Sequence, residues 1–374
     1  MLLPTATRQS FTIRKGLLSF RGIISTLPWI LQTTRGMTSK VTSPSFSSPT
    51  VGVAQLRATN NKVHNLLEIA KCTGWAKGKN VSMIFLPENC GFMGEAPGET
   101  LENAEPPIGE EHCNPHALTQ ILQNVYEKAY RGESFAENEF SEFYTMNHVS
   151  LLDGLRALAR ASKIWISVGG MHVLGAPPHP ESGKNRFYNT HVVLDDEGAV
   201  KAVYRKIHLF DVCIPEKVNL MESNSTAGGK EIVLCDTPVG RLGLATCYDM
   251  RFPELFAELV KQGAQILLLP SAFTVPTGQA HWHILLRARA IECQTYVIAA
   301  AQYGEHNIKR SSYGHSLIVD PWGVVLADAG GVDNDAPVET SLITAEIDLG
   351  LIDSVRTRMP LQQHREAADF GSKR

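Results

Sequence analysis

Three side chains that could cooperate in acyl transfer, Glu88, Lys206 and Cys247, each stand where an expected strand ends. Cys247 follows the short apolar strand at 241–246 and precedes a helix that Pro253 can begin, since proline suits the first turn of a helix. We expect its thiol to be exposed, with a pKa lowered by the nearby helix N-terminus. A small buried cysteine in the core is the alternative interpretation.

A thiolate nucleophile needs a base to accept its proton and donors for the oxyanion that its attack creates. Glu88 can be that base, because we expect a carboxylate in a dry pocket to have its pKa raised toward neutrality. Lys206 and the backbone N–H of Tyr248 can hold the oxyanion. Taken singly, Glu88 could be a turn or cap residue and Lys206 a solvated hairpin end. Their common place at the carboxyl ends of strands, where α/β sheets form sites, favours the catalytic interpretation.

Strands and helices alternate from residue 51 onward and must bring these groups together. Alternating or continuous apolar runs predict strands at 51–57, 81–86, 164–170, 187–194, 199–205, 241–246, 266–269, 296–301, 314–319, 324–327 and 343–347. Apolar residues at helical spacing and helix-end signals predict helices at 61–77, 151–161, 253–263 and 282–294. The interleaving predicts an α/β fold in which helices cover sheets, and the hairpins predict mixed sheets.

Residues 110–149 fit this alternation poorly. They are polar and show no clean helical or strand period, so we expect an insertion on the surface. Sequence that splicing should have removed is the alternative. The insertion lies between a loop and the helix at 151–161, outside the motifs that carry the three candidate groups. It could therefore shape the rim of a pocket without disturbing those groups.

The first 36 residues are typical of a mitochondrial targeting segment, because they carry arginines, are rich in Ser and Thr and contain no acid. A secretory signal and a disordered tail are the alternatives, and the scattered cysteines disfavour secretion. Residues 37–50 are a predicted linker, 51–365 the predicted domain and 366–374 a predicted tail. Met37 offers a second start, which would leave a cytoplasmic form beside the mitochondrial one.

Composition excludes several classes of protein. The chain is −3 and residues 1–50 are +6, so residues 51–374 are −9, and an acidic body disfavours nucleic acid as a partner. No uncharged apolar run approaches the ~18 residues of a membrane span, so we expect no membrane partner. The seven cysteines include no C-x-x-C pair, which argues against a disulfide framework and a zinc site, and we expect no metal.

The motifs around the three groups resemble those of the nitrilase superfamily, the carbon–nitrogen hydrolases with a Glu–Lys–Cys triad. They are Phe85–Glu88, Tyr204–Leu209 and Ala245–Glu254, and the resemblance covers residues 50–365 apart from the insertion. It implies Cys247 as nucleophile, Glu88 as proton acceptor and Lys206 as proton donor or oxyanion stabiliser. Glu222 matches the position of a second glutamate in many members.

The resemblance also implies an α-β-β-α sandwich and a homodimer or larger homo-oligomer, often formed through helices near the nucleophile. The implied chemistry is hydrolysis of a small amide through a cysteine thioester. Because no step of that chemistry is a redox reaction, we expect no cofactor.

Further motifs resemble the animal nitrilase-homologue branch, the deaminated glutathione amidases; they lie at 270–273, 277–282, 286–292 and 312–316. The branch implies a substrate in which the glutamyl amine of glutathione has become a ketone, with 2-oxoglutarate and cysteinylglycine as products. By similarity to this branch and its ω-amidase sister, Arg251, Phe273 and Thr277 would line the pocket. Arg251 could hold a carboxylate bidentately, although an ion pair with Glu254 and plain core packing are the structural alternatives for these residues.

Three other functions stay open. An ω-amidase would act on 2-oxoglutaramate or succinamate with the same triad. A papain-like cysteine hydrolase would use His208 or His315 as base, but the surrounding motifs do not fit it. An inactive homologue would act as an interaction protein, which the intact triad disfavours.

Overall fold

The computed structural model describes residues 48–368 except residues 97, 110–114, 134–136, 215–217 and 334–338. These residues belong to one unit, Ser47–Arg374. The predicted targeting segment and most of the predicted linker and tail lie outside the described residues.

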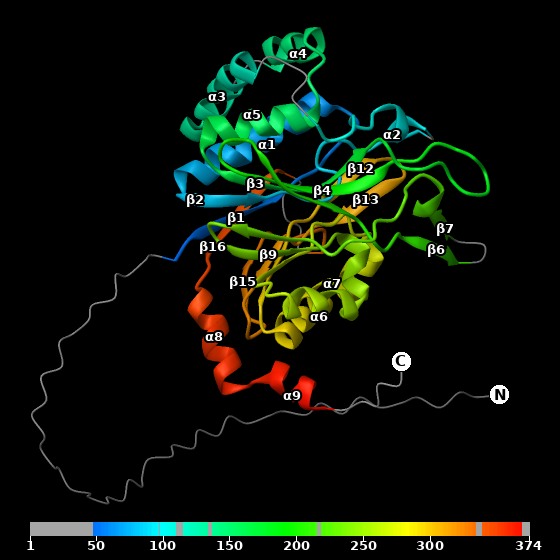
Figure 1. Cartoon of the computed structure of the whole chain (residues 1–374). Helices are drawn as coiled ribbons and strands as arrows, with labels where there is room; N and C mark the ends of the chain where they lie inside the picture. Colours follow the sequence, from blue (N-terminus) through cyan, green and yellow to red (C-terminus); the bar gives the residue numbers. More distant parts are fainter. Residues whose placement is uncertain are drawn as a thin grey trace, which may run out of the picture. The chain divides into compact units, whose positions relative to one another are not determined.

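Two six-stranded sheets form the centre of the unit (Figure 1). The first sheet has the order β16-β1-β2-β3-β4-β5, with β1 (Thr50–Gln55), β2 (Val81–Phe85), β3 (Trp165–Val173), β4 (Tyr188–Leu194), β5 (Val200–Arg205) and β16 (Ser341–Glu346). Strands β1, β2 and β3 run parallel, whereas the pairs toward both edges are antiparallel. The sheet is therefore mixed, as the hairpin pattern predicted.

The second sheet repeats this plan, with a parallel centre and antiparallel edges. Its order is β15-β14-β11-β10-β9-β8, with β8 (Leu234–Thr237), β9 (Gly240–Leu244), β10 (Ile266–Leu268), β11 (Tyr296–Ala299), β14 (Leu317–Val319) and β15 (Val325–Asp328). Alternate side chains of the two sheets meet in one apolar layer, which includes Val51, Val53, Met83, Phe85, Leu242, Leu244, Ile266 and Leu268. A fully buried side chain of this kind contributes about 1.5–3 kcal/mol.

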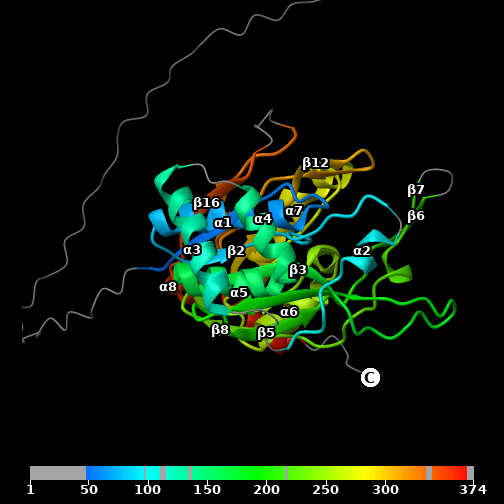
Figure 2. The same cartoon turned by 90° about the horizontal axis from the view of Figure 1, so that it is seen from above.

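Helices cover both outer faces, which completes the predicted α-β-β-α sandwich (Figures 1 and 2). Helices α1 (Lys62–Gly78) and α5 (Leu151–Ser162) share an apolar cluster with the first sheet. Helices α6 (Pro253–Lys261) and α7 (Val275–Cys293) do the same for the second sheet. Helix α7 begins seven residues before the predicted start at Trp282, because Pro276 in its first turn supports an earlier beginning.

The expectation that residues 110–149 lack a regular period was wrong. Helices α3 (Pro115–Arg131) and α4 (Glu137–Met146) lie there, outside α1 and α5 (Figure 1). The buried residues of α3 recur at helical spacing; they are Leu118, Leu122, Val125, Tyr126 and Ala129. Since these side chains join the same cluster as α1 and α5, the segment is packed into the fold rather than laid on it.

Several short elements that the sequence analysis did not predict surround the ends of the sheets. They are α2 (Glu99–Glu102), the hairpin of β6 (Asp211–Ile214) and β7 (Val218–Met221), η1 (Glu222–Asn224), η2 (Cys247–Arg251), and the hairpin of β12 (Tyr303–Asn307) and β13 (Arg310–Tyr313). Helices α8 (Leu349–Arg358) and α9 (Leu361–Ala367) follow the last strand. The β6–β7 hairpin projects from the body on the same side as α2 in both views (Figures 1 and 2).

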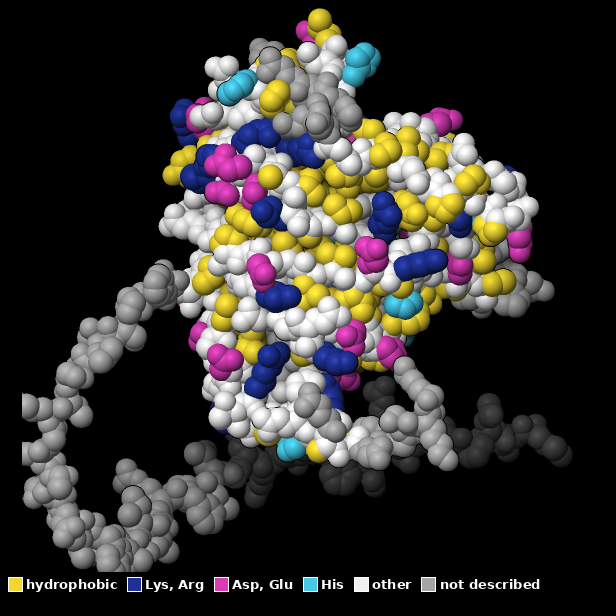
Figure 3. Space-filling model, in the orientation of Figure 1, with side chains coloured by type: hydrophobic (Ala, Val, Ile, Leu, Met, Phe, Trp, Pro, Cys, Tyr) yellow, Lys and Arg dark blue, Asp and Glu magenta, His cyan; other side chains and the backbone are white. Residues whose placement is uncertain are grey.

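The surface carries both signs of charge. Figure 3 shows Lys and Arg side chains interspersed with Asp and Glu over the visible face, without the continuous basic patch that nucleic-acid binding requires. Within the described part of the chain, no helix has both the length and the apolar character needed to cross a membrane.

The packing of α3 predicts how shortening one buried side chain changes the free energy of unfolding. Leu122→Ala should lower the free energy of unfolding by about 2–5 kcal/mol, because it removes buried methyl groups and leaves a cavity under the helix. Urea denaturation followed by circular dichroism measures the change. The neighbouring exposed change Asn124→Ala is the control and should stay within about 0.5 kcal/mol. Equal effects of the two changes on the free energy of unfolding would show that the packing of α3 does not stabilise the fold.

Candidate active site

The structure brings Glu88, Lys206 and Cys247 to one place between the two sheets. Glu88 follows β2 and Lys206 follows β5 of the first sheet, while Cys247 follows β9 of the second. The Cys247 thiol hydrogen-bonds the Glu88 carboxylate. Lys206 Nζ donates to Glu88 Oε1 at 3.1 Å. The carboxyl ends of strands from both sheets therefore supply one shared cluster, as open α/β sheets do.

Cys247 begins the short helix η2 with φ at +49°, a left-handed conformation that costs free energy for a residue other than glycine. The fully buried Asp249 fixes this turn, since its Oδ2 accepts from the backbone N–H of Thr246 at 2.9 Å and from the Tyr204 hydroxyl at 2.7 Å. The bond from the Thr246 N–H to Asp249 is one half of the capping-box pattern, and the buried Thr246 hydroxyl has no partner among the described residues. The sequence analysis missed Asp249, although the Thr-x-x-Asp spacing was the signal that could have found it.

Lys206 is buried between two carboxylates. Its ammonium lies 3.1 Å from Glu88 Oε1 and 2.9 Å from Glu222 Oε2. Glu222 is itself held by the backbone N–H of Phe210 at 2.6 Å. Burial alone would lower the pKa of Lys206, but the two carboxylates outweigh it and raise the pKa well above its ordinary value. Lys206 is therefore a fixed positive charge.

Both oxygens of the Glu88 carboxylate are held in place. Asn189 Nδ2 donates to Oε1 at 2.8 Å, and the backbone N–H of Ala272 donates to Oε2 at 3.0 Å. Burial raises the pKa of Glu88, but the Lys206 charge and the hydrogen bond from Cys247 outweigh burial, so the pKa lies below its ordinary value. The expectation of a raised pKa was wrong, because the pocket is not merely dry but contains an ammonium.

The pKa of Cys247 is raised, first by burial and then by the negative charge of Glu88. The expected lowering was wrong, because these two influences exceed the opposing effect of Lys206. The thiol is only partly accessible rather than exposed. The resting site therefore holds a neutral thiol beside an ionised carboxylate, an arrangement in which a proton can pass from the sulfur to Glu88.

A cavity of about 630 Å³ opens in front of the three groups. The four residues expected at the substrate all line it: Tyr248, Arg251, Phe273 and Thr277. The Arg251 guanidinium lies 5.6 Å from the centre of the Phe273 ring and 3.3 Å from His281 Nδ1. Among the described residues Arg251 forms no ion pair with Glu254 or any other acid. The Thr277 hydroxyl is bonded to the Thr274 hydroxyl at 2.7 Å.

His172 also lines the cavity, and the sequence analysis missed it. Burial, with the charge of Arg310 as a further cause, lowers the pKa of His172 to about 4, so its imidazole is neutral near pH 7. A neutral imidazole can accept one hydrogen bond from a ligand and donate another.

Neither histidine of the papain-like alternative reaches the thiol or lines the cavity. His208 Nδ1 lies 2.7 Å from Asp249 Oδ1, and the ring stacks on Phe252. His315 lies between Asp328, at 2.9 Å from Nδ1, and Asp333, at 2.6 Å from Nε2. Both histidines are thus engaged by carboxylates of their own, and the thiol is left with Glu88 as its base.

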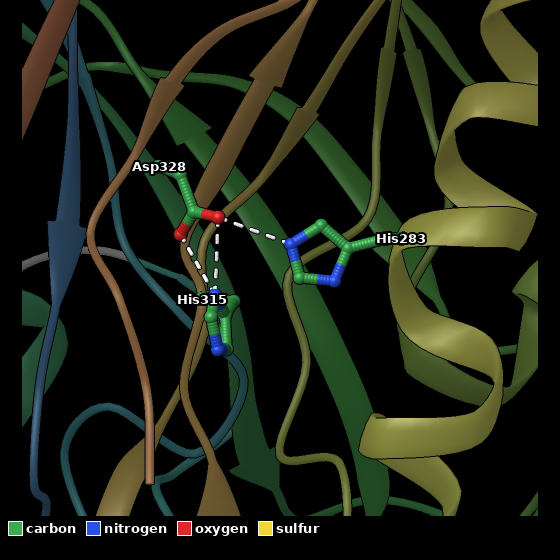
Figure 4. Close-up of side chains that lie close together, drawn as sticks. All are labelled: His283, His315 and Asp328. Atoms are coloured by element: carbon green, nitrogen blue, oxygen red, sulfur yellow. Dashed lines mark hydrogen bonds and ion pairs between the residues drawn. The ribbon is translucent and has the colours of Figure 1, made fainter. Parts of the chain in front are cut away.

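One cluster among the described residues has the side chains to hold a metal ion. His283, His315 and Asp328 each offer a ligand atom, all within 4.8 Å of one another (Figure 4). Cysteine spacing could not reveal this cluster, since it contains no cysteine. Figure 4 also shows that Asp328 already binds both imidazoles. The cluster lies outside the cavity lining.

The charges around the thiol predict that one mutation makes the Cys247 thiol more acidic and yet abolishes amide hydrolysis. Glu88→Gln should move the titration of the Cys247 thiol to lower pH, because burial still raises its pKa but the negative charge of Glu88 no longer adds to it, and Lys206 still lowers it. Amide hydrolysis should nevertheless be lost with the base. Ultraviolet absorbance of the thiolate, corrected with Cys247→Ala protein for the other cysteines, measures the titration. An unchanged or higher midpoint would contradict this electrostatic account.

Comparison with known proteins supports the same chemistry. The family model for carbon–nitrogen hydrolases matches residues 50–357. The deaminated glutathione amidase of Dictyostelium discoideum is 39% identical over 325 residues, which is 86% of this chain and 94% of that protein. A nitrilase and fragile histidine triad fusion protein of Drosophila melanogaster is 41% identical over 85% of this chain, but the chain spans only 57% of the fusion protein.

Solved structures agree. The crystal structure of Saccharomyces cerevisiae Nit3, described as a member of branch 10 of the nitrilase superfamily, matches with a TM-score of 0.63. That match is 27% identical and covers 85% of this chain and 97% of Nit3. The family predicted from the motifs around Glu88, Lys206 and Cys247 is confirmed: the chain belongs to the carbon–nitrogen hydrolases of the nitrilase superfamily.

Proposed function

We propose that this hydrolase cleaves the amide bond of deaminated glutathione and releases 2-oxoglutarate and cysteinylglycine. The observation that carries the proposal is a thiol, an ionised carboxylate and a buried ammonium facing one cavity of about 630 Å³. Such a volume suits a small-molecule substrate. Relatives that bear the name deaminated glutathione amidase support the choice of substrate, since they match this chain over most of their own length.

In the first step, the thiol of Cys247 gives its proton to Glu88 while the sulfur attacks the amide carbon. The carbonyl oxygen gains the negative charge, which the Lys206 ammonium and the backbone N–H of Tyr248 stabilise. Among the described residues this N–H has no acceptor, because it lies in the first turn of η2. Removing one such donor typically costs about 10²–10³ in rate.

In the second step, Glu88 gives the proton to the leaving nitrogen, the carbon–nitrogen bond breaks, and a thioester remains on Cys247. Glu88 then takes a proton from water, which hydrolyses the thioester. The contacts from Asn189 and Ala272 keep the carboxylate aimed at the sulfur through both transfers. Glu222 acts as a positioning residue, because it holds the second side of the Lys206 ammonium.

Intact-mass spectrometry after brief incubation with deaminated glutathione tests the nucleophile and the substrate together. Wild-type protein should carry a 2-oxoglutaryl adduct on Cys247 and release cysteinylglycine, whereas Cys247→Ala should fold normally, carry no adduct and release nothing. Steady-state turnover of 2-oxoglutaramate by the same preparation compares the ω-amidase alternative. Faster turnover of 2-oxoglutaramate, with no adduct from deaminated glutathione, would contradict the proposed substrate.

We propose that the protein forms a homodimer through the outer face of α7. Ile284 and Ile291 of this helix are 70% and 46% exposed, two turns apart on one face. Trp322, 55% exposed, lies in the adjoining turn, which Arg287 binds through the carbonyl of Gly323 at 2.8 Å. Large exposed apolar side chains that adjoin one another are typical of an interface.

Replacement of Ile284 by aspartate tests the dimer. Ile284→Asp should yield a folded monomer in sedimentation velocity, because a charge at the centre of an apolar interface is left without a partner. Ile308→Asp is the matched control, since Ile308 is a fully exposed isoleucine outside α7, in the turn between β12 and β13, and should leave the dimer intact. A dimer that withstands Ile284→Asp would place the interface elsewhere.

A further inference from the structure

The β12–β13 hairpin carries two cations at the mouth of the catalytic cavity. Lys309 lies in the turn of the hairpin and Arg310 begins β13, and both line the cavity beside Asn307 and Ser311. Both cationic side chains are exposed. The sequence motifs that identified the triad and Arg251 did not include this pair.

The hairpin is fixed to the body, so it presents these cations in a defined place. His306 Nδ1 hydrogen-bonds the carbonyl of Ala58 at 2.8 Å, and its Nε2 hydrogen-bonds the Ser312 hydroxyl at 2.8 Å. The next residue of β12, Asn307, donates from Nδ2 to the carbonyl of Gly94 at 3.3 Å. The hairpin therefore belongs to the wall of the cavity.

Lys309 and Arg310 have no anionic partner among the described residues. Lys206, by contrast, is neutralised by two carboxylates. The positive charge of Arg310 nevertheless interacts electrostatically with Glu88, and it adds to the lowering of the pKa of that carboxylate by Lys206. These cations thus face the substrate space without a protein group that satisfies them.

The charged side chains that line the cavity carry a net positive charge. The cavity is lined by four cations, Lys206, Arg251, Lys309 and Arg310, and by three carboxylates, Glu88, Glu95 and Glu222. Two of these carboxylates bind Lys206 deep in the site. Apart from Lys206 and its two carboxylates, the lining therefore holds three cations, Arg251, Lys309 and Arg310, against one carboxylate, Glu95, which favours a ligand with more than one negative charge.

We propose that Lys309 and Arg310 form a second carboxylate subsite, which holds the C-terminal carboxylate of a peptide leaving group. The inference rests on the proposed hydrolysis of deaminated glutathione. That substrate carries one carboxylate on each side of the attacked amide. Arg251 shares η2 with Cys247 and suits the shorter acyl arm. The leaving arm contains two residues, which extend by roughly 7 Å and point its carboxylate toward the mouth.

The subsite is tested with two substrates that differ in one charge, deaminated glutathione and its C-terminal amide. Wild-type enzyme should prefer the acid by about five- to tenfold in kcat/KM, the range of charge-assisted contacts at a partly exposed site. The double variant Lys309→Gln/Arg310→Gln should bring this ratio close to one, mainly through a higher KM for the acid. Lys201→Gln, an exposed charge on β5 outside the cavity, is the control and should keep the ratio.

The outcomes distinguish a wrong subsite from a wrong substrate. If wild-type enzyme hydrolyses both substrates and the double variant keeps the preference for the acid, the subsite is wrong and the proposed function stands. If wild-type enzyme hydrolyses neither substrate, both the proposed function and the proposed subsite are wrong. Because both substituted side chains are exposed, thermal unfolding should be unchanged, and an altered melting temperature would assign the effect to folding.

Discussion

The buried ammonium of Lys206 is the constraint on which the site depends. Taking a charge out of water is costly, and only close carboxylates with further hydrogen bonds offset that cost. Glu88 and Glu222 provide these carboxylates, and Asn189 and the N–H groups of Ala272 and Phe210 hold them. The groups come from both sheets and the loops between them, so the charge network also fixes how the two layers meet.

This network decides what kind of nucleophile the cysteine can be. An ionised Glu88 beside Cys247 opposes a second negative charge, which keeps the sulfur protonated until an electrophile arrives. The left-handed turn at Cys247 then has a physical role, because it directs the thiol toward the carboxylate at a conformational cost that Asp249 offsets. In the proposed mechanism, proton transfer to Glu88 activates the sulfur, and no preformed thiolate is needed.

Much of this could be read from the sequence, because strand ends and motif spacing are local properties. Glu88, Lys206 and Cys247 each follow an apolar run, and the family motifs around them are distinctive. The directions of the pKa shifts could not be read in this way. They depend on Lys206 and Glu88, which are 118 residues apart in the chain but 3.1 Å apart in space. Helix α3 was not predicted because most of its residues are polar, and its few buried apolar residues form only a narrow stripe along one face.

Catalysis and recognition occupy different depths of the same cavity. The acyl-transfer groups follow β2, β5 and β9, and Glu88 and Lys206 are buried there between the two sheets, which leaves little freedom for change. The groups that could distinguish substrates lie on η2 and on the β12–β13 hairpin, where side chains can vary without disturbing the core. A hydrolase built in this way can keep one mechanism while the charge of its rim selects the leaving group. Specificity then follows from electrostatics at the mouth rather than from the triad.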